Sequence, residues 1–438
     1  MNPINSQKNK SLRFSFLDGV FASGMVGFTQ EYFTPFLLIL GATAKHIGVL
    51  NALPNLVASL IQLKSADLVE KIKSRKKIIN IFVFLQALML LPMAFIALIG
   101  AVSPALFIAM VVMFTSFGAL ANPAWGSLMS DLVKEEKRGE YFGWRNRTLG
   151  FIIVAATFIA GIILHNFKKI NVFDGFVIIF SFAAIFRIIS WYFLKKMHEP
   201  SLEYNKGNSF TLLNFLSKIK KSNFAKFVLF VSMMNFSVNI SAPFFAVLML
   251  KDLHFSYMLY TVITATATLT IYLTIARWGR QADKIGNLKV IKFVSPLIGI
   301  IPLLWIINRH PIFLVFAQIF SGFLWAGFNL CASNFIYDSV TSAKRTRCIA
   351  YFSALNGIAL CGGSLLGGFL LQKLPNLFGY KILSLFLLSS VLRILVGIFM
   401  PMKLKEVRPI EKISNNKLFF SIIGMKPLLG VERKTVRY

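Results

Sequence analysis

The sequence predicts an all-α integral membrane protein with twelve transmembrane helices, arranged as two parallel six-helix repeats around a central cavity. Three observations lead to this fold class. Hydrophobic residues make up 56% and charged residues 15% of the 438-residue chain, and its mean hydropathy of +0.68 lies outside the range of soluble domains. The apolar residues are gathered in stretches of membrane-spanning length, and the second half of the chain repeats features of the first.

Twelve apolar stretches reach the length of about 20 residues that a helix needs to cross a hydrocarbon layer of roughly 30 Å. They contain Leu, Ile, Phe, Gly and Ala without the two-residue alternation of barrel strands, so each is expected to be a helix. In chain order, the expected spans are 13–40, 46–66, 78–99, 104–131, 141–165, 173–196, 226–250, 257–277, 289–308, 312–338, 347–372 and 379–402.

The basic residues are sorted between alternate loops, and their distribution predicts the orientation of the chain. With the N-terminus placed inside, 38 of the 47 Lys and Arg residues lie on that side, and 7 lie in the loops of the other side. Basic residues near helix ends resist translocation, so both termini are expected in the cytoplasm, and the bacterial cytoplasmic (inner) membrane is the expected location. The net charge of +30 then follows from topology, with a secondary attraction to anionic membrane lipids and no nucleic-acid partner.

Six features recur in the same order in the two halves, at a shift of a little over two hundred residues. One of them is the count of six spans in each half. The others are Phe28, Glu31 and Pro35 matched by Phe236, Asn239 and Pro243; Ala66 and Asp67 matched by Ala282 and Asp283; Asp131 and Arg138 matched by Asp338 and Arg345; Tyr141, Phe142 and Asn146 matched by Tyr351, Phe352 and Asn356; and Arg187 matched by Arg393.

This repeat predicts the domain bounds. It divides the chain into a six-helix bundle at 1–196, a cytoplasmic linker at 197–225, a second six-helix bundle at 226–402 and a basic cytoplasmic tail at 403–438. Two bundles in the same orientation are the plan of a transporter whose substrate site forms between the halves near the bilayer midplane. The tail could lie on the inner leaflet as a short amphipathic segment or extend as a disordered basic chain.

The loop at 279–289, with the sequence GRQADKIGNLK, contains Gly279, Arg280, Asp283 and Lys284. It resembles the loop signature that the major facilitator superfamily carries between the second and third helices of each half. The corresponding segment at 64–77, KSADLVEKIKSRKK, keeps the Ala-Asp pair and the basic run but lacks both glycines. The chain therefore resembles a member of this superfamily over essentially its whole length up to about residue 402.

The resemblance implies a gate on the cytoplasmic side of the bundle. In the family, the loop aspartate braces neighbouring helix ends, a role that falls on Asp283 and, through the degenerate copy, on Asp67. A carboxylate near a helix N-terminus gains from the exposed backbone N–H groups and the helix dipole, by about 0.3 to 1 kcal/mol when solvated. The expected members of this gate are Asp67, Gly279, Arg280, Asp283, Lys284, Asp131, Arg138, Asp338 and Arg345, the alternative being a solvated loop ion pair.

Glu31 is the most unusual residue of the first span, because it alone of the 17 acidic residues falls well inside a span. Helical geometry places Gly24, Gly27 and Thr34 on its face, a small-residue stripe suited to packing or to lining a cavity. A charge is costly in hydrocarbon, so Glu31 is expected to face protein or water, or to be protonated. We expect a coupling or substrate-contacting acid, since proton coupling requires a carboxyl that protonates reversibly. The alternative is a protonated structural Glu that is hydrogen-bonded inside the bundle.

Asparagine residues at bundle depth supply the other candidate contacts. In the superfamily that the chain resembles, residues of the first, fifth, seventh and eleventh spans face the central cavity. Pro54 beside Asn55 additionally marks a place where a freed backbone carbonyl could meet a ligand. The candidate solute contacts besides Glu31 are therefore Asn55, Asn146, Asn235, Asn239 and Asn356, with interhelical hydrogen bonds as the alternative for each.

Three charged residues lie near the inner ends of spans, and none of them is expected to bind the solute. Arg187 and Arg393 lie about eight residues before the inner ends of their spans, where long basic side chains can extend to the headgroups. Asp18 lies close to the inner end of the first span, and we expect it to be a solvated helix-end charge rather than part of the cavity wall.

The function that fits these features best is secondary active transport of a small organic solute, by symport or antiport, with protons as the candidate coupling ion through Glu31. A primary pump is disfavoured, because the sequence has no Gly-rich phosphate loop followed by Lys-Ser/Thr. No enzyme activity, metal site or cofactor is expected, since the five His and three Cys residues lack catalytic or ligand spacing. We expect a monomer; a membrane receptor or assembly scaffold on the same fold is the alternative.

Overall fold

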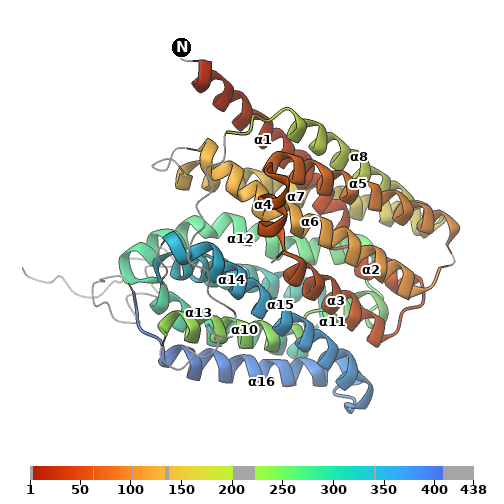
Figure 1. Cartoon of the computed structure of the whole chain (residues 1–438). Coiled ribbons are helices and arrows are strands. Elements are labelled where there is room, and N and C mark those ends of the chain that lie inside the picture. Colours follow the sequence, from red (N-terminus) through yellow and green to blue (C-terminus); the bar gives the residue numbers. More distant parts are fainter. Residues whose placement is uncertain are drawn as a thin grey trace, which may run out of the picture.

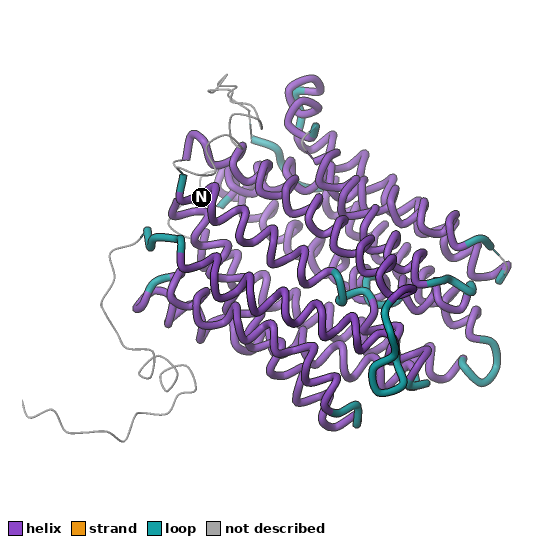
Figure 2. Tube along the Cα trace, turned by 90° about the horizontal axis from the view of Figure 1, so that it is seen from below, coloured by secondary structure: helices purple, strands orange, loops and turns teal. Residues whose placement is uncertain are grey.

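The computed structural model describes residues 3–62, 64–100, 102–133, 138–200, 222–339 and 342–407, and these residues are almost entirely helical (Figures 1 and 2). Ten helices within these ranges are long and apolar enough to cross a membrane. The first and second expected spans, which carry more polar residues, complete the twelve, so the predicted fold class is confirmed. Most of the linker and the tail beyond residue 407 lie outside the described residues.

The first half of the chain forms the upper part of the bundle in Figure 1. The helices α5, α6 and α8 begin where the sequence supplies an N-cap, because the side chains of Ser74, Ser103 and Asn171 accept hydrogen bonds from backbone N–H groups of the first turn. The helices of this half are α1 (Pro3–Thr29), α2 (Phe33–Ile39), α3 (Ala44–Gln62), α4 (Ser65–Ile72), α5 (Arg75–Ile99), α6 (Pro104–Leu132), α7 (Arg138–Phe167) and α8 (Val172–Lys195).

The second half forms the lower part of the same view. Ser222 and Ser256 cap α10 and α12 in the same way. The elements of this half are α10 (Asn223–Asn239), α11 (Phe244–Val247), the π-helical turn η2 (Leu248–Asp252), α12 (Tyr257–Ile285), α13 (Asn287–Ile307), α14 (Pro311–Ser339), α15 (Ser342–Lys373) and α16 (Lys381–Met402).

The first and seventh spans are interrupted by turns, whereas the sequence predicts continuous helices. The chain turns at residues 30–32 between α1 and α2, and again at residues 240–243 between α10 and α11. A proline lies at or shortly after each break, and it contributes to the break because it has no N–H to donate to the carbonyl four residues earlier. Pro35 frees the carbonyl of Glu31 in this way, and Pro243 frees that of Asn239. The repeat thus places a helix break at corresponding positions of the two halves.

The second expected span also ends earlier than predicted. The helix α3 stops at Gln62, and residues 65–72 form the separate short helix α4. The turn that follows α4 forms without the glycines of the loop signature, because Lys73 takes the left-handed conformation with φ of 55°. In the second half, Gly286 with φ of 91° occupies the turn between α12 and α13.

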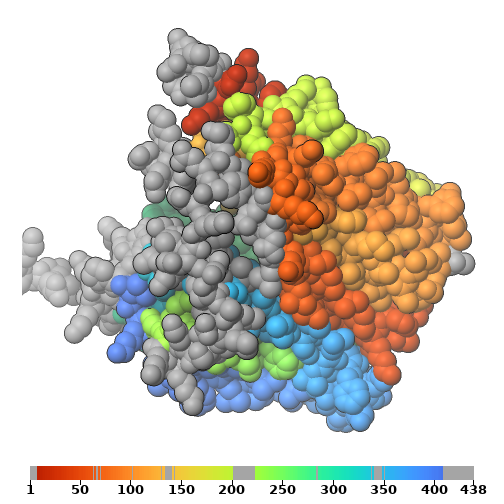
Figure 3. Space-filling model, viewed as in Figure 1, coloured from red at the N-terminus to blue at the C-terminus, as the bar shows by residue number. Residues whose placement is uncertain are grey.

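The two halves are joined along two helix pairs, α3 with α15 and α7 with α12. Figure 3 shows the first of these pairs as a seam between the surfaces of the two halves. Glycine permits the close approach, since a Cβ atom at Gly48 of α3 would lie 2.9 Å from the backbone oxygen of Ser364 of α15. We call the end of the bundle at residues 200 and 222 the linker end, and the end at residues 40–44 and 308–310 the short-loop end.

The buried apolar residues show at which end the halves are sealed. One cluster at the short-loop end contains residues of both halves, among them Phe36 and Phe180 from the first half and Phe244 and Phe386 from the second. At the linker end, two separate clusters lie within the second half and within the first half. The halves therefore share a core at the short-loop end and have independent cores at the linker end.

Replacing Gly48 by Leu is expected to lower the free energy of unfolding by about 1 to 3 kcal/mol, because the new side chain overlaps the α15 backbone. The matched control is Gly126→Leu on α6, where no atom lies within 4 Å of the added Cβ and the change should stay within about 0.5 kcal/mol. Denaturant unfolding of the purified protein measures both. Equal stability of the two variants would contradict the tight seam.

Candidate functional site

A cavity of about 790 Å³ lies between the two halves. Its wall is built from α1, α2, α3, α5, α6 and α8 of the first half and from residues 242–249, α12 and α14 of the second. This volume is in the range of cavities that enclose a small organic molecule. Because both halves contribute to the wall, any movement of one half against the other changes the cavity.

Glu31 lies in this wall, at the turn between α1 and α2. Its carboxylate has no hydrogen-bond or ion-pair partner within the described ranges of the chain. The backbone oxygen that Pro35 leaves free accepts a hydrogen bond of 2.7 Å from the hydroxyl of Tyr260 on α12. The helix break therefore presents the acid to the cavity and links its backbone to the opposite half.

Tyr32, the next residue, makes a second link between the halves. Its hydroxyl donates to the backbone oxygen of Thr157 at 2.6 Å and lies 2.8 Å from the hydroxyl of Thr261 on α12. Of the small residues predicted on the face of Glu31, Thr34 also lines the cavity. Gly24 and Gly27 instead allow close packing, since an added Cβ would meet α8 and α7 respectively.

The cavity wall is rich in carboxamides. Asn55, a predicted contact, lies in the wall with its amide nitrogen bonded to the backbone oxygen of Asn51 at 2.7 Å. Carboxamides both donate and accept hydrogen bonds, so they suit polar solutes without selecting a charge. The wall contains Gln30, Asn51, Asn55, Gln62, Gln86, Asn122 and Gln318. Only Asn55 of these seven is among the sequence-based candidates, although each of the others is an amide in an apolar span.

The remaining candidate asparagines lie elsewhere. The amide of Asn235 donates to the side-chain oxygen of Asn356 at 3.1 Å, which joins α10 to α15 inside the second half. Asn239 donates to the backbone oxygen of Asn235 at 2.9 Å, one turn earlier in α10. Asn146 is exposed on α7. These four residues lie outside the cavity wall in this conformation.

Arg187 was expected to extend to the headgroups, and the structure shows that it does not. It is 9% exposed, lines the cavity, and donates to the side chains of Gln86 on α5 at 2.9 Å and Ser190 at 3.0 Å. Ser190 in turn donates to the carboxylate of Asp18 at 2.6 Å. Asp18 is 4% exposed, so the expectation of a solvated helix-end charge is also wrong. Together these residues form a buried polar network behind the cavity wall.

Arg393, the repeat counterpart of Arg187, is likewise buried and not directed to the headgroups. Its guanidinium donates to Ser389 at 3.0 Å, to the hydroxyl of Ser241 at 2.7 Å and to the backbone oxygen of Val238 at 3.1 Å. A cation at this position is favoured by the dipole of α10, whose C-terminal end it contacts. Arg393 therefore braces the break of the seventh span.

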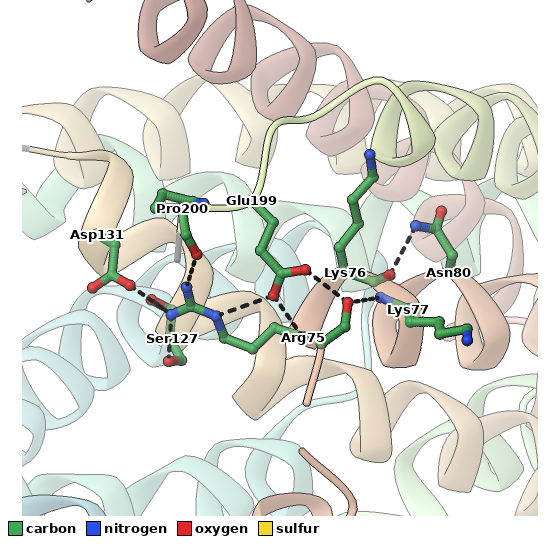
Figure 4. A network of polar contacts seen from close by, with 9 residues as sticks. Arg75, Lys76, Lys77, Asn80, Ser127, Asp131, Glu199 and Pro200 are labelled. Atoms are coloured by element: carbon green, nitrogen blue, oxygen red, sulfur yellow. Dashed lines mark hydrogen bonds and ion pairs between the residues drawn. The ribbon is translucent and has the colours of Figure 1, made fainter. Parts of the chain in front are cut away.

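The linker end of the first half contains a second polar network, which we call the Arg75 bracket (Figure 4). Arg75 at the start of α5 is 1% exposed, and its guanidinium lies 2.6 Å from the carboxylate of Asp131 at the end of α6. Glu199 accepts hydrogen bonds of 2.7 Å from the hydroxyl of Ser74 and from the backbone N–H of Arg75. This carboxylate also gains from the dipole of α5, so three helix ends are tied together.

The second half repeats the bracket with an amide in place of the arginine. Asn287 at the start of α13 donates to the carboxylate of Asp338 at 2.9 Å. Glu406 accepts a hydrogen bond of 2.7 Å from the backbone N–H of Leu288. Asp131 and Asp338 are predicted gate residues, whereas their partners at the helix starts and the two glutamates were not predicted. Glu199 and Glu406 are separated by the same number of residues as Asp131 and Asp338. This shared separation is the sequence signal that could have identified the two glutamates.

The other predicted gate residues are placed only in part. Gly279 is partly buried and Arg280 exposed, both near the end of α12. Asp283 and Lys284 follow in the same helix, Asp67 lies in α4, and the side chains of these three residues lie outside the described part of the structure. The same holds for the side chains of Arg138 and Arg345, at the starts of α7 and α15.

A membrane bundle of two helical repeats that enclose a polar cavity is the architecture of a solute transporter. The sequence profile of the Major Facilitator Superfamily matches residues 19–248 and 225–431. The chain therefore belongs to the Major Facilitator Superfamily, as the loop at 279–289 indicates. A comparison with curated proteins gives no match.

Several solved transporter structures are similar to the chain. The nucleoside transporter NupG is 16% identical with a TM-score of 0.68, over 92% of this chain and 100% of that chain. A bacterial homologue of the human lysosomal transporter Spinster, in an inward-facing and unoccupied conformation, is 13% identical with a TM-score of 0.64, over 92% and 96%. The human organic anion transporter MFSD10 (TETRAN) is 14% identical with a TM-score of 0.60, over 90% and 99%. At these identities, the likeness establishes the shared fold.

Proposed function

We propose that the chain is a secondary active transporter that moves a small polar organic solute by alternating access, with protons coupled through Glu31. The observation that carries this proposal is the cavity between the halves, which holds an acid without a partner among the described residues. A carboxyl in such a cavity can exchange a proton with water while the halves change their arrangement. Asn55 is the proposed solute contact beside it in this conformation. The candidates outside the wall, Asn146, Asn235, Asn239 and Asn356, are proposed as contacts in other states of the cycle.

The proposed orientation places the linker end in the cytoplasm of a bacterial inner membrane. It rests on the excess of basic residues in the loops of that end. With this orientation, the core shared by both halves closes the outer side, whereas the clusters of the inner side each lie within one half. The conformation would then be the inward-facing one, in which the solute enters or leaves on the cytoplasmic side.

The proposed solute class follows from the chemistry of the wall. Seven carboxamides provide donors and acceptors for hydroxyl, amide or heterocyclic groups. The acid of Glu31 and the cation of Arg187 are the ionisable groups of the wall besides Tyr260, and Arg187 already has Asp18 nearby. A solute with several hydrogen-bonding groups, neutral or cationic, fits this lining best, because a fixed negative charge would meet Glu31 without a free cation.

An untargeted metabolite comparison tests the transport function. Cells with and without the chain are compared together with their medium, and membrane insertion is verified in parallel. We expect one class of polar solute to accumulate or to be depleted when the chain is present. No shift of any solute despite inserted protein would contradict transport and favour a receptor or scaffold on the same fold.

The gate is expected to control the rate of transport. We propose that Asp283 stabilises the state in which the linker end is closed, by bracing neighbouring helix ends with Arg138 or Arg345 as partner. Asp283→Asn removes the negative charge but keeps the shape, so transport velocity should fall while expression is retained. Unchanged velocity in an initial-rate assay would refute the role.

A further inference from the structure

A second hollow, away from the central cavity, lies on the outer surface of the first half. It is a groove of about 590 Å³ between the start of α5 and the end of α8, at the linker end. Its lining includes the lysines Lys76, Lys77 and Lys195, which we call the rim, and Ile81, Phe84 and Trp191, which we call the floor. We call it the α5–α8 groove. The transport proposal makes no use of it.

The groove combines a cationic rim with an aromatic floor. The Nζ atom of Lys195 lies 4.5 Å from the ring centroid of Trp191, and the rings of Trp191 and Phe84 are 4.8 Å apart. Figure 4 shows the side chains of Lys76 and Lys77 pointing away from the Arg75 bracket. No acidic residue is among the described residues that line the groove, and Glu199, which accepts from Ser74 at its edge, also accepts from the backbone N–H of Arg75.

The positions along α5 match the layers of a membrane. Phe84 lies seven residues beyond Lys77, which corresponds to about 10 Å along a helix. The exposed apolar residues Ile81 and Phe84 therefore lie at hydrocarbon depth, while the lysines stand at the level of the headgroups. A ligand that fills the groove needs an anionic head at the rim and an apolar body on the floor.

The groove is not a general consequence of the repeat. The second half has Leu288 and Lys289 where the first has Lys76 and Lys77 at the start of the helix. At the positions that correspond to Trp191 and Lys195, it has Gly397 and Pro401. The basic rim and aromatic floor are therefore a local feature of the first half, although both halves have basic loops at this end.

We propose that the α5–α8 groove is a binding site for an anionic phospholipid. The phosphate is held by the three lysines, and an acyl chain lies along the floor. The charge of the rim selects an anionic headgroup over a zwitterionic one, since each Lys near the surface adds to the attraction. The adjoining Arg75 bracket would place the lipid next to the helix ends that form the gate.

The experiment measures lipid binding to the full-length protein by native mass spectrometry. Phosphatidylglycerol and phosphatidylcholine are added separately to the wild type and to the groove variant Lys76→Gln/Lys77→Gln/Lys195→Gln. The control, Lys289→Gln/Lys292→Gln/Lys403→Gln, removes the same number of charges from the linker end of the second half. We expect the groove variant to lose phosphatidylglycerol affinity by at least about tenfold and the control to change by about twofold or less.

Further arms separate the possible explanations. The variant Lys76→Arg/Lys77→Arg/Lys195→Arg should restore binding if charge in the groove is the cause, and melting curves should show that all variants are folded. Equal losses in groove variant and control, or equal affinity for both lipids, would overturn the proposal. Full competition by free glycerol 3-phosphate would also overturn it, because the site would then recognise a soluble phosphate rather than a lipid.

Discussion

Glu31→Gln is expected to abolish proton-driven accumulation of the transported solute while exchange of the solute across the membrane continues. The substitution keeps the size of the side chain and its place in the cavity wall but removes the group that can titrate. With a one-proton coupling, a gradient of one pH unit supports up to about tenfold accumulation, and this factor should fall to about one. Uptake into proteoliposomes, with and without an imposed pH gradient, measures the effect.

A control for this prediction is Gln30→Ala, which alters a neighbouring amide of the same wall and leaves the acid in place. It should weaken solute binding and preserve the response to the pH gradient. Gradient-driven accumulation that survives in Glu31→Gln would contradict the coupling role. A loss of folded protein in that variant would favour the structural alternative, in which a protonated Glu31 holds the bundle together by hydrogen bonds.

Asp18→Asn is expected to give the largest loss of stability. Asp18 is the acid that faces Arg187 through Ser190 in the buried network, and its removal leaves the guanidinium buried without a negative charge. Uncompensated buried charges cost about 3 kcal/mol or more. Denaturant unfolding of the purified protein should show this loss, together with a lower yield of inserted protein.

The double variant Asp18→Asn/Arg187→Gln should recover most of the loss, because it removes both buried charges and leaves neutral side chains in the network around Ser190. The matched control is Asp174→Asn at the first turn of α8, a partly exposed acid whose removal should cost about 1 kcal/mol or less. If the double variant is no more stable than the single one, the two charges do not depend on each other and the network is misassigned.

The twelve spans and the repeat could be predicted from the sequence because lipid imposes length and composition on every segment. The breaks were missed although one contribution to each was visible. Pro35 and Pro243 served as markers of the repeat, and the missing N–H of proline opens the helix one turn before each of them. Proline alone does not predict a break, because α3, α5, α6 and α13 continue through Pro54, Pro92, Pro123, Pro296 and Pro302.

The burial of Arg187 and Arg393 and the identity of their partners could not be predicted from the sequence. Position along a span gives depth, but not whether the side chain faces lipid or protein. The partner of Arg187 on α5 lies 101 residues away, and Arg393 bonds to the turn after α10, more than 150 residues away. Contacts between residues so far apart in the sequence depend on how the helices pack, and no local sequence pattern predicts that packing.

The most direct test of alternating access is a pair of distance measurements by spin labelling, one across each end of the bundle. The labels replace Lys71 and Lys292 at the linker end, and Ile170 and Ile307 at the short-loop end, all of which are exposed. The three native cysteines are buried and would be replaced by Ala, and each labelled protein must retain transport.

We predict that solute and pH shift the two distances in opposite directions: a second population appears with a shorter linker-end distance and a longer short-loop distance. Its fraction should respond to pH in the wild type and not in Glu31→Gln. Distances at both ends that stay fixed with and without the solute, at every pH where transport is measured, would contradict the account.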